Sequence, residues 1–71
     1  MTMHSSDIIK LANLGVNIEI SKDSSLHPSD ALEVVKIVAE IGSQIIIKKK
    51  YHTDYLIQMA EVGRDHVTIA V

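Results

Sequence analysis

One pattern of apolar and polar positions occurs three times along the chain. Its central motif is an apolar residue, alanine, asparagine or glutamate, another apolar residue and glycine, at positions 11–15, 38–42 and 59–63. Each motif ends an amphipathic run, and a β-like run follows it at 16–20, 44–47 and 66–71. A change from helical periodicity to strand alternation predicts a helix followed by a strand. The motif alanines stand at 12, 39 and 60, so the spacings are 27 and 21 residues, within the range of repeat architectures.

The upstream ends of the three units also match. Each unit has an apolar residue, then histidine, then serine or threonine and aspartate, at 3–7, 26–30 and 51–54. The hydroxyl residue of each segment is a good N-cap, and the aspartate would lie in the first helical turn. Each motif glycine would follow the last turn, where a left-handed conformation is needed. The predicted N-caps are Ser6, Ser29 and Thr53.

The middle unit is the most apolar, which predicts that it lies at the centre. Its helix, about 30–41, has only a narrow polar stripe, and its strand Ile45–Ile47 is apolar on both faces. Strands joined through helices run parallel, with right-handed crossovers. The sequence therefore predicts an α/β fold with a three-stranded parallel sheet and three helices on one face, an (αβ)3 solenoid-like repeat. The strand residues expected to face the helices are Val16, Ile18, Ile20, Val67, Ile69 and Val71.

Length and composition predict a single domain, with units at about 4–22, 27–49 and 52–71 of the 71 residues. The chain has no cysteine, which excludes disulfides. Its net charge of −2 lacks the basic footprint expected of a nucleic-acid partner. No apolar run reaches the about 18 residues of a membrane span, and no signal sequence is present, so we expect a cytoplasmic protein without a membrane partner.

The third unit carries a resemblance to a known kind of repeat. Its helix segment 54–63, followed by Val67-Thr68-Ile69, is similar to short bacterial tandem α/β repeats, which have a helix ending in Ile-Ala-x-x-Gly and a strand of Val-Thr-Ile type. The resemblance extends over nearly the whole chain. It implies a binding scaffold, and it brings no catalytic residues with it.

Three histidines occupy the same place in each unit: His4, His27 and His52. That place is the edge at the carboxyl ends of the strands, where ligands of open α/β sheets usually bind and where helix N-termini attract anions. One interpretation is therefore a metal site or an anion site. The alternative is that histidine is merely tolerated before the helix cap.

Lys48, Lys49 and Lys50, followed by Tyr51, form the one basic cluster of the sequence. The cluster indicates contact with an acidic protein. Alternatively, it is the solvated end of the central strand, where lysines also discourage aggregation. Together with exposed positions of the sheet, it defines the predicted partner-binding set: Lys48, Lys49, Lys50, Tyr51, Ile46, Thr68 and Ile69.

No nucleophile elbow, phosphate-binding glycine loop or zinc-protease pair occurs in the sequence, so we expect neither catalysis nor a cofactor. The favoured interpretation is a non-enzymatic protein-interaction module. It would act as an adaptor, regulator or inhibitor of a larger protein, as small proteins of phages and mobile elements do. Open strand edges also predict a homo-oligomer or docking on a partner. The alternatives are a ligand- or metal-sensing module that uses the repeated histidines, and a capping fragment of a longer repeat protein.

Overall fold

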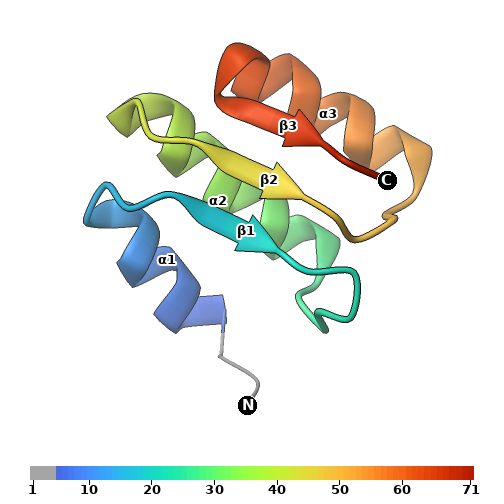
Figure 1. Ribbon diagram of the computed structural model, residues 1–71, viewed down its shortest axis with the longest axis horizontal. Coiled ribbons are helices and arrows are strands. Elements are labelled where there is room, and N and C mark those ends of the chain that lie inside the picture. Colours follow the sequence, from blue (N-terminus) through green and yellow to red (C-terminus); the bar gives the residue numbers. More distant parts are fainter. Residues whose placement is uncertain (1–4) are drawn as a thin grey trace.

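Helices and strands alternate strictly along the chain in the computed structural model, which describes residues 5–71 (Figure 1). The predicted α/β class is confirmed, because the three strands form one all-parallel sheet in the order β1-β2-β3. The elements are α1 (Ser5–Asn13), β1 (Ile18–Ile20), α2 (Pro28–Ile41), β2 (Ile45–Ile47), α3 (Thr53–Gly63), the 3-10 turn η1 (Arg64–His66) and β3 (Val67–Ile69).

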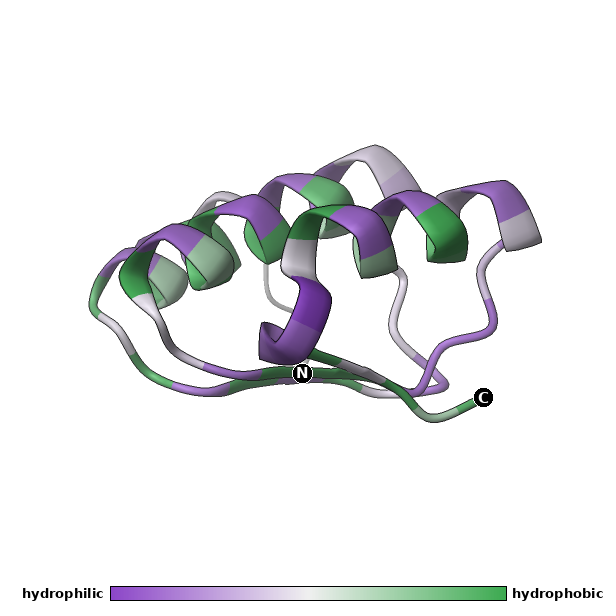
Figure 2. Ribbon diagram, turned by 90° about the horizontal axis from the view of Figure 1, so that it is seen from above, coloured by the Kyte–Doolittle hydropathy of each residue, from purple (hydrophilic) through white to green (hydrophobic). Residues whose placement is uncertain are grey.

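The sheet register decides which side chains meet the helices. Ile18, Ile45 and Val67 stand side by side, and so do the three residues two positions further on. All three helices cover the same face of the sheet, and the other face carries no helix in the described part of the chain (Figure 2). Because side chains alternate along a strand, the middle row points to the uncovered face. That row consists of Glu19, Ile46 and Thr68.

The core lies between the helix layer and the sheet, and it is centred on α2 and β2. As predicted, α2 packs against both other helices and β2 is the central strand. Two inward positions were predicted wrongly: Val16 and Val71 lie outside the three-residue strands and are 43% and 61% exposed. Six large side chains are fully buried: Ile45, Ile47, Met59, Val34, Val35 and Val38.

Histidine, and not serine or threonine, caps α2 and α3. The N-cap residues are His27 and His52, and α2 then begins at Pro28, whose fixed φ suits the first helical position. The imidazole Nδ1 is two bonds from Cβ, as the side-chain oxygen of asparagine is, so it can reach the same backbone N–H. The predicted hydroxyl caps lie instead at the first or second helical position: Ser6, Ser29 and Thr53.

The glycines after the helices do not share one role. Gly42 has φ 91° and its N–H donates to the carbonyl of Val38, which is the predicted left-handed cap of α2. Gly63 has φ −84° and belongs to α3, so the same prediction was wrong there. The residue with positive φ at this end is Arg64, with φ 51° and ψ −120°, which is not the left-handed helical conformation of Gly42.

Gly63 is needed for space. A Cβ at this position would lie 2.8 Å from Cγ1 of Val67 and 2.9 Å from Cγ1 of Val35. Both distances are shorter than real Cβ contacts. The absence of a side chain therefore lets the end of α3 pack directly on β3 and α2.

Candidate functional site

The two described histidines of the repeated set hold helix ends. Nδ1 of His27 accepts a hydrogen bond from the Ser29 N–H at 3.4 Å, and Nδ1 of His52 accepts one from the Asp54 N–H at 3.2 Å. Because Nδ1 of each ring is engaged at the helix end, Nε2 is the ring nitrogen that stays available to other partners. Helix capping thus explains the histidine at both repeated positions that the structure describes, His27 and His52.

The metal interpretation of these histidines remains a prediction. Within residues 5–71, no three histidine, cysteine, aspartate or glutamate side chains converge closely enough to hold a metal ion. The third member of the set, His4, lies outside the described residues.

The lysine cluster does not form one patch, because its members point to different surroundings. Nζ of Lys48 lies 3.5 Å from Oε1 of Glu19 across the β1–β2 pair. Nζ of Lys49 lies 5.9 Å from the ring centroid of Tyr51, within reach of a cation–π contact. Lys50 is exposed. Of the three, Lys48 is the one that lies beside the uncovered face of the sheet.

Tyr51 is a core residue. It is 7% exposed, and its hydroxyl donates to the carbonyl of Leu26 at 2.8 Å. Burial raises the pKa of this phenol above the usual 10.0, and the negative charge of Asp30 raises it further. The side chain therefore ties β2 to the start of α2, and we leave it out of the exposed surface. Ile69 also faces the helices and is half-buried, so only its backbone lies at the sheet edge.

The uncovered face of the sheet brings together residues from all three strands. Glu19, Ile46 and Thr68 stand in one row across it, and Lys48 follows Ile46 on the same side of β2. Ile46 is only half-buried although it lies on the central strand. We call this set (Glu19, Ile46, Lys48 and Thr68) the open sheet face. It has an apolar centre with charged and polar residues around it.

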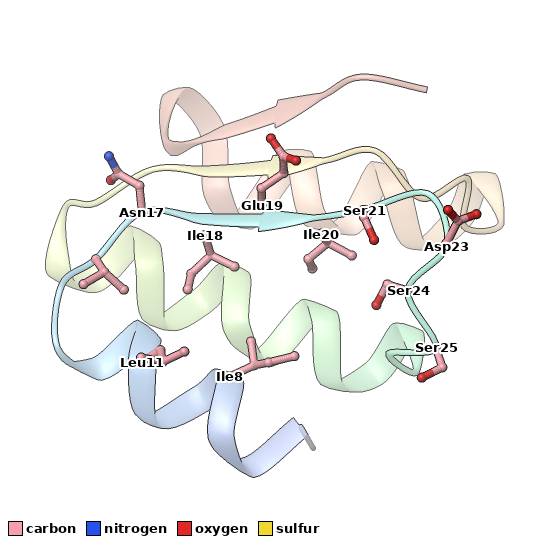
Figure 3. A pocket seen from close by; sticks show the side chains of 11 residues that line it. Ile8, Leu11, Asn17, Ile18, Glu19, Ile20, Ser21, Asp23, Ser24 and Ser25 are labelled. Carbon is pink, nitrogen blue, oxygen red and sulfur yellow. The ribbon is translucent and has the colours of Figure 1, made fainter. Parts of the chain in front are cut away.

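A groove of about 550 Å³ lies between α1 and the free edge of β1 (Figure 3). Ile8 and Leu11 point into it from the helix, and Ile18 and Ile20 point toward the helix layer from the strand. Polar residues of the β1–α2 loop line one end, among them Ser24 and Asp23. We call this hollow the β1 groove. The sequence did not predict this groove, because it depends on how α1 packs beside the edge of β1.

The geometry defines a small α/β protein of three helix–strand units with an all-parallel sheet. No protein-family model, no curated protein and no solved structure matches this chain. Among the described residues, no helix is both long and apolar enough to cross a bilayer.

Proposed function

We propose that this protein is a non-enzymatic interaction module that acts by occupying the surface of a larger protein, as an adaptor, regulator or inhibitor. The observation that supports the proposal is the open sheet face. A parallel sheet is usually covered on both sides. Here Ile46 lies at the centre of one side, and no helix of residues 5–71 covers that side. Protein interfaces commonly combine an apolar centre with a polar rim.

The charge around this face favours an acidic partner surface. Lys48, Lys49 and Lys50 follow the central strand directly, on a chain whose net charge is −2. Of these, Lys48 lies beside the open sheet face, 3.5 Å from the carboxylate of Glu19. Positive charge at this edge would accelerate association with an acidic surface and disfavour basic ones. Thr68 contributes a hydroxyl on the neighbouring strand, which can donate to a carboxylate.

The test compares two triple variants of equal charge change. Proteins that co-purify with the native chain are identified, and the Kd for the purified partner is measured. The variant Lys48→Glu, Lys49→Glu, Lys50→Glu is expected to weaken binding at least tenfold, an effect that should shrink with added salt. The control reverses the charge of three exposed lysines elsewhere in the fold, by replacing Lys10, Lys22 and Lys36 with glutamate.

The control variant should bind as the native chain does, and both variants should keep the native circular dichroism spectrum. Equal affinity of the first variant and the native chain would contradict the proposal. An equal loss in both variants would also contradict it, since binding would then follow net charge and not this face.

A further inference from the structure

Among the described residues, no strand pairs with β1 on the side away from β2. The N–H of Ile18 donates to the Gln44 carbonyl, and the carbonyl of Ile20 accepts from the Lys48 N–H, so both residues bond toward β2. The N–H and C=O groups of successive strand residues point to opposite neighbouring strands within the plane of the sheet. The N–H and C=O of Glu19 therefore point away from β2, into the β1 groove.

The helix above this edge is already in place. In the repeated motif, Leu11 occupies the position of Val38 in α2 and Met59 in α3. Val38 and Met59 are 0% exposed, whereas Leu11 is only half-buried and lines the groove. Figure 1 shows α1 on the far side of β1 from β2. The groove is thus a place for a strand that has a helix over it and is not filled by any strand of residues 5–71.

The opposite end of the molecule has complementary features. No described strand lies beyond β3, and its inward residues Val67 and Ile69 are only half-buried. On α3, Ile57 is 51% exposed, and Ala60, three positions later and on the same side of the helix, is also exposed. This end therefore offers a strand with a free edge together with an apolar helix flank.

We propose that the occupant of the β1 groove is β3 of a second copy of this chain, so that copies associate head to tail. The same parallel register would continue, with Val67 of one copy beside Ile18 of the next and Thr68 beside Glu19. The flank of α3 around Ile57 would then pack against Leu11 on α1, in the way that α2 packs on α1 within one chain.

The internal repeat is the reason to choose a second copy over an unrelated strand. The contact between consecutive units is made twice within the chain, at β1–β2 and at β2–β3, each with three residue pairs in parallel register. The two ends carry the two halves of that same contact. Thr68 is uncharged, so its approach to Glu19 meets no like-charge repulsion. This contact is made by the strand edges and the helix flanks: it brings Thr68 beside Glu19 in the row of the open sheet face but does not cover that face, and it does not depend on the proposed function.

A head-to-tail contact joins different surfaces of the two copies, and it therefore does not stop at a two-fold dimer. The expected assemblies are growing chains or rings, whose mean mass rises with concentration. A contact between two identical grooves would give a dimer only.

The test uses one variant for each end. Leu11→Glu places a charge in the β1 groove, and Ile57→Glu places one on the flank of α3. Each variant alone should be a monomer, because one of its two surfaces is blocked. An equimolar mixture should form a one-to-one dimer of twice 7.8 kDa, because one variant keeps its β3 end and the other keeps its groove. The measurement is light scattering coupled to size exclusion.

The matched controls are Asn13→Glu on α1 and Gln58→Glu on α3, both at exposed positions near the test residues. Glutamate already holds the position of Asn13 in the motifs of the other two units. They should associate as the native chain does. If Leu11→Glu fails to fold, Leu14→Glu replaces it, since Leu14 is 76% exposed. The triple lysine variant should also associate normally, so a failure of the proposed partner surface is distinguishable from a failure of this inference.

Two results would overturn the inference. A native chain that stays monomeric at high concentration would show that no second copy enters the groove. If Ile57→Glu alone still forms dimers while Leu11→Glu does not, the groove pairs with a second groove, and the head-to-tail geometry is wrong.

Discussion

The first and the middle unit have the same motif and very different surroundings. Val38 and Ile45 of the middle unit are fully buried, because a helix and a strand lie on each side of them. Leu11 and Ile18, at the equivalent places of the first unit, are half-buried and line a groove. The local sequence thus sets the helix and the strand, whereas the number of neighbouring units sets how deeply a side chain is buried. The following predictions test this contrast.

The largest expected effect is on the free energy of unfolding when strand isoleucines are truncated. Ile45→Ala should lower it by about 2–5 kcal/mol, as is usual for a fully buried isoleucine. Ile18→Ala, at the equivalent place of the first unit, should cost less than half as much. Denaturant unfolding at concentrations low enough to keep the chain monomeric gives both values. If Ile45→Ala does not fold, Ile45→Val should still cost about 0.5–1.5 kcal/mol. Equal losses at the two positions would contradict the contrast.

Next in size is the effect of a side chain where α3 meets the middle unit. Gly63→Ala should destabilise the fold by about 1–3 kcal/mol, as overpacking does, because its Cβ would collide with Val35 and Val67. Gly42 provides the comparison, since a Cβ there meets nothing within 4 Å and only its φ is unusual. Asparagine tolerates that conformation, so Gly42→Asn should melt close to the native temperature. Gly63→Asn should melt well below it.

Tyr51 should make the middle unit sensitive to alkaline pH. Its pKa is raised in the folded chain by burial and by Asp30, so folding favours the protonated phenol. The resulting stability is complete below the unfolded pKa of about 10 and is lost as pH rises through the folded pKa. Tyr51→Phe removes the hydrogen bond to Leu26 and should cost about 0.5–1.5 kcal/mol at neutral pH.

The check on Tyr51 is the difference in the free energy of unfolding between the native chain and Tyr51→Phe, measured as a function of pH. That difference should shrink as the phenol ionises. A difference that stays constant through the alkaline range would show that the Tyr51 proton is not coupled to folding.

The smallest effect concerns the histidine caps. His52→Ala should cost about 1 kcal/mol, the usual loss for an N-cap, and His27→Ala about the same. His52→Asn should recover most of the loss, because its side-chain oxygen can accept the Asp54 N–H. The melting temperatures of the three variants, measured by thermal unfolding, test this expectation. If asparagine proves as damaging as alanine, the histidine has a role other than capping.

Much of the architecture could be predicted from periodicity, because a helix with one apolar side and a strand apolar on both faces have few ways to pack. The order of the strands and the central place of α2 could be predicted in this way. The role of Gly63 could not be predicted, since it depends on Val35, which is far from it in the sequence, and on the turn that brings Val67 back against the end of α3. The histidine caps were missed because a hydroxyl residue, the commoner cap, follows each histidine by one or two positions.

The candidate surfaces were predicted less completely than the fold. Ile46, Lys48 and Thr68 were placed correctly by alternation on one face of the sheet. Tyr51 follows three lysines and reads as exposed in the sequence, yet the turn after Lys49 directs it into the core. The β1 groove depends on a neighbour that the first unit lacks, and no local pattern in the sequence encodes that.

The central claim is that the two ends of this fold are halves of one contact. Its most direct test is the mass of the native chain in solution, measured by light scattering over a wide concentration range. The account predicts a mean mass that starts near 7.8 kDa and rises past the dimer as concentration increases. A folded monomer at every concentration, or a dimer that never grows, would contradict it.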